Sequence, residues 1–590
     1  MLIKLIASAF FIFSVSTLRV SADPFVQNQK LGRGINMGNM FDAPSEGEWD
    51  VSFKDHYFDS IAQKGFQSVR VPIRWSAPQR TQLTEPYTIS DDFFARIDHV
   101  IEKALNSGLS IIINVHHYEE LFRDATGFHR DRFIAIWQQI SEHYSEYSDS
   151  LYFEVLNEPY GDLTPDRWNT LFAEVLQIIR SNNPTRTVLI GTAEWGGIEG
   201  LRHLEIPNDP NLILTVHYYS PFEFTHQNAF WLTGMEQYKG TTWDGTFIQK
   251  NDIINHMERI RSFAQKHNIP VNIGEFGAYG EADSTSRYLY SSFVSRLFER
   301  YDFSWHYWEF CAYFGAYDPY QEKWVDTIVN ALISSDTSIL YIDDFAPKGN
   351  NLITNGGFDS DLQDWTFGTW DQSGQASSEV INGELTINIE RKPQESWQVQ
   401  LIQNGIQLQQ NTEYIVMFDA RSKVPVSIHA DVSASGEPWT TFGSSDGLIL
   451  SEKMRTYAFE FTVTQSHSNA RLVFNLGTDP TTIHFDNIRI IELSDDRTNI
   501  QSRPKKTPSM FGSKIDKLPQ GLHLDFVSSK AQNATVALFN ANGRMIASKT
   551  IHTTAGQNSI QFPQHINPGP IFIRFQTEEG SHVERFMNVK

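Results

Sequence analysis

Several side chains that could bind a substrate or act on it as acids, bases or nucleophiles stand in or at the ends of short apolar segments in the first domain. They are Arg70, His116, His117, Asn157, Glu158, His217, Tyr219, Glu275, Trp308 and Glu309. Hydrolysis of a glycosidic bond needs two carboxyl groups: one donates a proton to the leaving oxygen, and the other attacks the anomeric carbon or activates a water. Glu158 and Glu275 are the candidates for this pair.

Metal or thiol chemistry finds less support in the sequence. His116 and His117 could ligate a metal, but no third ligand stands at zinc-like spacing. The single cysteine, Cys311, is expected to be a packed thiol without a catalytic role. We therefore expect catalysis without a cofactor.

The elements that would position these residues follow a regular alternation between residues 30 and 345. Short apolar runs occupy Gly34–Met37, Ser68–Ile73, Ser110–Val115, Leu151–Leu156, Thr187–Ile190, Leu212–Val216, Val271–Ile273 and Phe303–Tyr307, and amphipathic stretches lie between most of them. Eight strand–helix units predict an α/β domain, a (β/α)8 TIM barrel, whose active site lies at the carboxyl ends of the strands. A doubly wound sheet is the alternative, but we see no glycine-rich phosphate loop.

Composition limits the partners. The 590 residues include 48 Lys+Arg and 70 Asp+Glu, for a net charge of −22. Nucleic-acid binding needs clustered basic residues, so this charge disfavours it, whereas a neutral polymer needs no charge complement. Aromatic residues make up 13% of the chain, and some of their rings could stack on the apolar faces of sugars.

The beginning of the chain is typical of a secretory signal peptide. Lys4 precedes an apolar run, and the small residues Val20-Ser21-Ala22 offer a cleavage site. The run is too short to span a bilayer permanently. We expect residues 1–22 to be removed and the protein to be secreted, to the medium or to a bacterial cell surface.

Changes in sequence texture divide the rest of the chain. We expect the catalytic barrel over residues 23–345, a β-sandwich of jelly-roll type over 346–493, a polar linker over 494–517 and a small β-module over 518–590. The sandwich is predicted because alternating strand patterns replace helical periodicity after residue 351.

Seven segments of the first domain carry a family resemblance. They are Gly34–Asn39, Gly65–Pro72, Asn114–His117, Leu156–Pro159, His217–Tyr219, Ile273–Gly277 and Tyr307–Phe310. Together they resemble the strand-end motifs of family 5 glycoside hydrolases, the cellulase family, over about residues 30–335. The resemblance implies a TIM barrel that cleaves internal β-1,4-glucosidic bonds with retention, through a covalent glycosyl-enzyme.

The resemblance also implies roles for single residues. Glu158 would be the acid/base and Glu275 the nucleophile. Arg70 would bind and orient Glu275, and we expect its charge to lower the pKa of that carboxyl. His217 would steer Glu158, and Tyr219 would hydrogen-bond Glu275.

The remaining site residues are implied to bind substrate. Asn157 would hydrogen-bond the 2-hydroxyl of the reacting sugar, and Trp308 would form the floor of the −1 subsite. His116 and His117 complete the predicted substrate-binding set. If Glu158 were not the acid/base, Glu309 or Glu223 would be the next candidate.

Polysaccharide preference stays open in the sequence. Residues 41–47 and Pro221–Gln227 resemble endoglucanases, some of which accept mannan. A β-mannanase or a mixed-linkage glucanase of the same fold is the alternative. From another class, a non-catalytic glycan-binding protein is the rival, although both glutamates are intact. We expect a monomer that acts on β-glucan, without a nucleic-acid partner or a membrane span in the mature chain.

The second and third modules carry weaker resemblances. Asn351–Phe358 and Phe485–Ile488 look like the ends of carbohydrate-binding modules of families 4 and 9, which implies a structural calcium at Asp486. Trp365 is expected in the core, whereas Trp370, Trp397 and Trp439 are candidates for stacking on glycan. Ala537–Asn540, Gly543-Arg544 and Pro568–Phe575, within residues 518–590, resemble the C-terminal sorting domains of bacterial type IX secretion. A small accessory β-module is the alternative.

Overall fold

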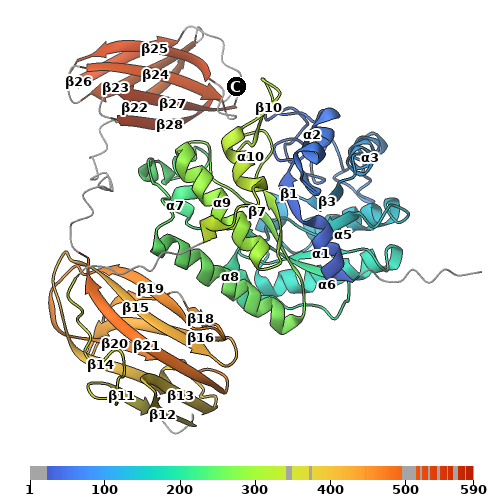
Figure 1. Cartoon of the computed structure of the whole chain (residues 1–590). Helices are drawn as coiled ribbons and strands as arrows, with labels where there is room; N and C mark the ends of the chain where they lie inside the picture. Colours follow the sequence, from blue (N-terminus) through green and yellow to red (C-terminus); the bar gives the residue numbers. More distant parts are fainter. Residues whose placement is uncertain are drawn as a thin grey trace, which may run out of the picture.

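The computed structural model describes residues 23–340, 349–370, 375–445 and 447–493, and seven strands between residues 513 and 588. The predicted signal peptide, residues 1–22, lies outside the described residues, as do residues 494–512 of the predicted linker. Three units follow one another along the chain: a barrel, a sandwich and a terminal β-module (Figure 1).

Eight parallel strands close into a barrel in the order β1 to β8, which confirms the predicted TIM barrel. They are β1 (Arg33–Asn36), β2 (Ser68–Ile73), β3 (Ser110–Val115), β4 (Leu151–Glu154), β5 (Val188–Gly191), β6 (Leu212–Tyr218), β7 (Val271–Phe276) and β8 (Ser304–Tyr307). Every residue of β2, β3 and β7 is buried. Both faces of such strands are covered, by packed side chains inside and by helices outside.

Helices surround the barrel (Figure 1). They are α1 (Pro24–Leu31), α2 (His56–Lys64), α3 (Asp91–Asn106), α4 (Glu119–Arg123), α5 (Phe128–His143), α6 (Pro165–Asn182), α7 (Phe222–Thr225), α8 (Phe247–His267), α9 (Ser284–Arg300) and α10 (Asp326–Ile333), with short 3-10 turns η1 (Ile198–His203), η2 (Met235–Tyr238) and η3 (Ser338–Leu340). A two-stranded hairpin of β9 (Tyr317–Asp318) and β10 (Lys323–Trp324) follows β8.

Local sequence explains where the long helices begin. Thr246 and Gln249 form a reciprocal capping box at the start of α8. Asp283 accepts a hydrogen bond from the backbone of Ser286 at the start of α9. Such caps satisfy backbone N–H groups that have no partner inside the helix.

The second unit is a sandwich of two antiparallel sheets, as predicted. One sheet has the order β11-β14-β20-β16-β17, with β18 paired to β16, and the other has the order β12-β13-β21-β15-β19. The strands are β11 (Thr366–Thr369), β12 (Gln375–Ile381), β13 (Glu384–Arg391), β14 (Val399–Leu408), β15 (Glu413–Ser422), β16 (Val426–Ala434), β17 (Thr441–Ser444), β18 (Leu448–Leu450), β19 (Arg455–Thr462), β20 (His467–Asn475) and β21 (Thr481–Glu492), and η4 (Ser396–Gln398) precedes β14.

Trp365 lies in the core between the two sheets, as predicted, with only 7% of its surface exposed. A second apolar cluster lies on the outer face of the sheet that contains β15 and β19. It comprises Ile415, Met417, Ala458 and Ile491, and Phe247 and Ile248 of α8 pack against it. The sandwich is therefore docked on the barrel through α8 (Figure 1).

The terminal module consists of β22 (Ser513–Leu518), β23 (Gly521–Ser528), β24 (Gln532–Asn540), β25 (Met545–Thr553), β26 (Gly556–Phe562), β27 (Gly569–Thr577) and β28 (Gly580–Asn588), in two antiparallel sheets. Because β22 begins at Ser513, the module starts five residues before the predicted boundary at 518. Among the described residues, none of the helices combines the length and the apolar character needed to cross a membrane.

Candidate active site

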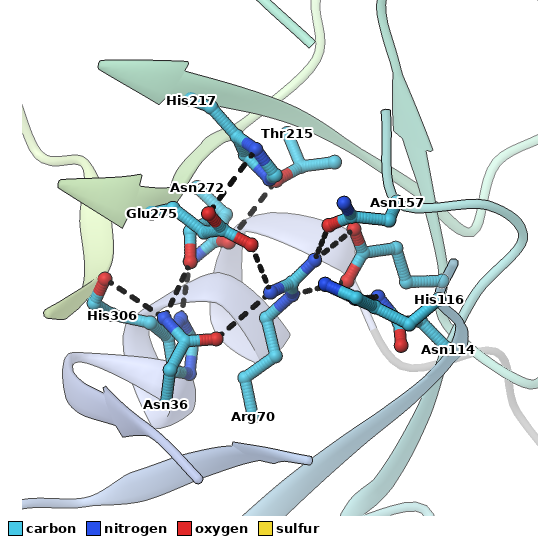
Figure 2. Close-up of polar contacts among 12 residues, drawn as sticks. Asn36, Arg70, Asn114, His116, Asn157, Thr215, His217, Asn272, Glu275 and His306 are labelled. Atoms are coloured by element: carbon cyan, nitrogen blue, oxygen red, sulfur yellow. Dashed lines mark hydrogen bonds and ion pairs between the residues drawn. The ribbon is translucent and has the colours of Figure 1, made fainter. Parts of the chain in front are cut away.

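Arg70 stands at the centre of a buried polar network inside the barrel (Figure 2). It belongs to β2, and its side chain is fully buried. Its Nη1 donates to Oε1 of Glu275 at 2.7 Å and to Oδ1 of Asn36 at 2.8 Å. Its Nη2 donates to Oδ1 of Asn157 at 2.7 Å. The predicted contact between Arg70 and Glu275 is present, and the arginine also orients Asn157.

The sequence reasoning missed another partner of Arg70. Glu154, the last residue of β4, accepts hydrogen bonds from Nε and Nη2 of Arg70 at 2.6 and 2.9 Å. The Glu154 side chain is fully buried. An acidic residue inside the apolar run Leu151–Leu156 was the available signal, because a buried carboxylate needs a paired cation.

Glu158 and Glu275 face each other across His217. Nδ1 of His217 lies 2.7 Å from Oε1 of Glu158 and 3.7 Å from Oε2 of Glu275. One carboxylate oxygen of each glutamate and a nitrogen of His217 all lie within 4.8 Å of one another. The Tyr219 hydroxyl donates to Oε2 of Glu275 at 2.9 Å. The chain thus brings together both candidate catalytic carboxyls and the two residues predicted to contact them.

The electrostatics of Glu275 differ from the expectation. Burial raises its pKa; His217 and Arg70 act in the opposite direction, and the net shift is upward. Arg70 lowers the pKa of Glu275, as expected, but burial has the larger effect, and the sequence reasoning did not include it. For His217, burial lowers the pKa of the imidazole. The carboxylates of Glu275 and Glu158 more than offset this effect, so the net shift of the His217 pKa is upward.

His116, His117 and Trp308 line the same rim. The rings of His116 and Trp308 lie parallel, with their centroids 6.0 Å apart. Burial lowers the pKa of His116 well below its ordinary value, so this imidazole is neutral near pH 7. Asp42, in the loop after β1, joins the two histidines: one ligand atom from each residue lies within 4.8 Å of the others.

The position of Asp42 corrects the prediction that His116 and His117 have no third potential metal ligand nearby. Asp42 was missed because it is far from His116 and His117 in sequence and follows a different strand. Its Oδ1 is buried without a hydrogen-bond partner, and burial raises its pKa. The three side chains could accept sugar hydroxyls or ligate a divalent metal.

Glu309 is poorly suited to the role of reserve acid/base. Its carboxylate accepts backbone N–H groups of Cys311, Ala312 and Phe314 at 2.9 to 3.2 Å. It is buried, and burial raises its pKa to about 8. Glu309 therefore holds the loop after β8. Cys311 is buried, as predicted, and Glu223 lies exposed on α7.

Comparison with known proteins identifies the barrel. The family model described as Cellulase (glycosyl hydrolase family 5) matches residues 33–314. Among solved structures, endoglucanase Cel5A from the hyperthermophilic Thermotoga maritima is 48% identical, and the match covers 53% of this chain and 100% of that chain with a TM-score of 0.52. The chain belongs to glycosyl hydrolase family 5.

Two curated relatives each match somewhat less than half of this family 5 chain. Endoglucanase H of Acetivibrio thermocellus is 38% identical over 275 residues, which are 47% of this chain and 29% of that protein. Endoglucanase A of Ruminococcus albus is 29% identical over 286 residues, which are 44% of this chain and 75% of that protein. The part of this protein that matches Endoglucanase H thus corresponds to less than a third of the length of that relative.

The family 5 barrel is followed by a carbohydrate-binding domain: the model described as Carbohydrate binding domain matches residues 350–481. One sheet of this domain carries a chain of polar contacts on its outer face. Nε1 of Trp370 donates to Gln400 at 3.0 Å, Gln400 donates to Asn475 at 2.8 Å, and Asn475 donates to Asp431 at 2.9 Å. Strand alternation turns these side chains away from the core, so the contacts cross β14, β20 and β16 on the outside.

Two aromatic rings lie near this polar row: Trp370 is its first member, and Trp439 stacks on Arg471, four residues from Asn475 along β20. The Trp370 ring covers Gly368, where a Cβ would come within 2.6 Å of it. The guanidinium of Arg471 stacks on Trp439, 4.3 Å from the ring centroid. Trp370 and Trp439 keep 42% and 46% of their surfaces exposed. Trp397, 48% exposed, lies in η4, so all three predicted stacking candidates are accessible.

Asp486, the predicted calcium ligand, lies among other acidic residues. Burial raises its pKa, and the nearby carboxylates of Asp419, Glu384 and Asp359 add to this shift. A Cβ on Gly357 would lie 4.0 Å from Oδ1 of Asp486, so the loop Asn355–Gly357 is adjacent to this carboxyl. The clusters of three close ligand atoms found among the described residues do not include Asp486, so its calcium site stays a prediction.

Proposed function

We propose that the chain is an endo-β-1,4-glucanase that hydrolyses internal bonds of β-glucan with retention of configuration. The observation that carries the proposal is the pair of carboxyls, Glu158 and Glu275, whose nearest oxygens lie within 4.8 Å with His217 between them. Retaining glycosidases hold their carboxyls about 5–5.5 Å apart, whereas inverting enzymes separate them by about 6.5–9.5 Å to admit a water.

In the first step, protonated Glu158 donates its proton to the glycosidic oxygen while a Glu275 oxygen attacks the anomeric carbon. The leaving sugar departs with that proton, and a covalent glycosyl-enzyme remains on Glu275. In the second step, Glu158 takes a proton from water, the hydroxide adds to the anomeric carbon, and the bond to Glu275 breaks. Both carboxyls return to their starting states.

Neighbouring residues support this division of work. Arg70 and Tyr219 each contact a different oxygen of Glu275, which holds the carboxylate in one orientation for attack. His217 contacts Glu158 and keeps the acid in place. Asn157 is held by Arg70, which leaves its amide nitrogen available to donate to the sugar 2-hydroxyl.

Glucan as substrate is supported by the relatives. Endoglucanase H and Endoglucanase A match the barrel, and the Thermotoga maritima enzyme has been solved with cellobiose and with mannotriose. Mannan and mixed-linkage glucan therefore belong in the test. Initial rates on carboxymethyl cellulose, barley glucan, lichenan, glucomannan and xylan should rank the β-1,4-glucans first. Preference for mannan or xylan would reject the proposed specificity.

The sandwich is proposed to retain the enzyme on polysaccharide. Its exposed Trp370 and Trp439 and the polar row that begins at Trp370 suit stacking and hydrogen bonding along a glucan chain. Asp486 is proposed as the structural calcium ligand of this domain. No cofactor is proposed for catalysis.

The cellular role rests on the chain ends. We propose secretion directed by residues 1–22, outer-surface sorting by residues 518–590, and action as a monomer. The support is the sequence pattern at each end and the separate β-module that begins with β22.

A further inference from the structure

Glu154 is a buried charge that the proposed reaction does not use. Its carboxylate has no exposed surface and meets Arg70 through two hydrogen bonds of 2.6 and 2.9 Å. Substrate cannot reach it, so any effect on the reaction must pass through Arg70. A well-packed apolar side chain is often as stable as a buried ion pair, which makes a purely stabilising role a weak explanation.

Arg70 is shared between two carboxylates. Glu154 binds its Nε and Nη2, whereas Glu275 binds only its Nη1. The three side chains together carry one net negative charge. A lone arginine beside Glu275 would instead hold that carboxyl at a low pKa and make it a weaker nucleophile.

We propose that Glu154 is a positioning residue that fixes the Arg70 guanidinium and offsets its charge, so that Glu275 keeps its nucleophilicity. The inference rests on the proposed function, in which Glu275 attacks the anomeric carbon. Two bonds to Glu154 align the planar guanidinium, and its remaining donors then meet Glu275, Asn36 and Asn157.

Other titratable groups around Glu275 are His217 of β6, Glu158 after β4 and Tyr219. His116 and His306 face Arg70, and both have pKa values lowered chiefly by burial. These groups are unchanged when Glu154 alone is substituted. A shift in the titration of Glu275 would therefore report the charge of Glu154.

The test is the pH profile of kcat/KM on an aryl cellobioside for wild type, Glu154→Gln, Glu154→Asp and Asn36→Ser. Losing the Glu154 charge leaves the full arginine charge on Glu275, so the acid limb of Glu154→Gln should move to lower pH by about one to two pH units. Its plateau should fall about tenfold. Glu154→Asp retains the charge and should keep the acid limb of wild type. Asn36→Ser removes a neutral partner of Arg70 and should also leave the limb in place.

Folding is checked by circular dichroism before the kinetics are interpreted. If Glu154→Gln fails to fold, Arg70→Gln is compared with Arg70→Gln/Glu154→Gln, in which both buried charges are gone. Because Glu154 acts through Arg70, the acid limbs of the single and the double variant should then coincide.

A Glu154→Gln limb that coincides with wild type, or a double variant whose limb differs from that of Arg70→Gln, overturns the inference. An inactive wild type would instead reject the proposed function, so the two failures are distinguishable.

Discussion

Replacing Ala458 with aspartate should separate the sandwich from the barrel without unfolding either. Ala458 lies on the outer face of β19 with 1% of its surface exposed, in the cluster covered by Phe247 and Ile248 of α8. Arg455 of the same strand hydrogen-bonds Asn255 of α8. A carboxylate at position 458 would be buried against the apolar side chains of this cluster.

The magnitudes decide between undocking and unfolding. Burial of a large apolar side chain contributes about 1.5–3 kcal/mol, so the partly buried α8 residues and the cluster they cover provide about 5–10 kcal/mol in total. Association costs about 4–15 kcal/mol in lost freedom, which the covalent link reduces. Docking is thus stable by only a few kcal/mol. An unpaired buried carboxylate costs about 3–5 kcal/mol, which is enough to cancel it.

The assay compares Ala458→Asp with Thr462→Asp. Thr462 lies four residues along the same outer face of β19 but is exposed, so it is a matched control. Small-angle scattering should show a larger radius of gyration for Ala458→Asp alone, and calorimetry should show its barrel and sandwich melting separately. Identical scattering and melting of the two variants would refute the docked arrangement.

Four further outcomes are expected. Trp370→Ala/Trp439→Ala should weaken retention on amorphous cellulose in a pull-down while leaving turnover of soluble cellotetraose unchanged; equal retention would reject the proposed binding face. Asp486→Asn should abolish the calcium-dependent rise in Tm of the wild type, and an equal rise in both would place calcium elsewhere or nowhere. Deletion of residues 518–590 should leave an active enzyme inside the envelope of its host, whereas normal release would reject the sorting role. Burial lowers the pKa of His306 to about 3, below its unfolded value, so its stabilising effect should be complete above about pH 6.5 and lost as the pH falls towards 3; Tm should decrease less steeply with falling pH in His306→Gln, and equal slopes would contradict this.

The barrel strands could be predicted closely because a strand that is buried on both faces is a continuous run of apolar residues in the sequence. The bounds of Ser68–Ile73 and Ser110–Val115 were predicted as the structure has them, since both runs are apolar on both faces. Strand β7 was predicted to end at Ile273 but continues to Phe276. Gly274 and Glu275 interrupt the apolar pattern, and their place in the strand is set by contacts with β6 and β8.

The catalytic pair and its direct partners could be named from the sequence, but their electrostatics could not. The acidic Glu154 inside an apolar run indicates a buried ion pair, but neither it nor Asp42 shows locally which residues it meets. Closure of the barrel brings Glu154 to Arg70 and Asp42 to the histidines. The apolar surface through which the sandwich docks on α8 could not be predicted from the sequence either. Outward-facing apolar residues such as Met417 cannot be distinguished from core residues until the sheet's two faces are known.

The central claim is tested most directly by the anomeric configuration of the first product. Hydrolysis of cellopentaose followed by proton NMR at early times should show the β-anomer of the new reducing end before mutarotation. The spacing of Glu158 and Glu275 requires this result, because a covalent sugar on Glu275 inverts the anomeric carbon twice. Early appearance of the α-anomer would mean direct attack by water and would contradict the assignment of Glu275 as nucleophile.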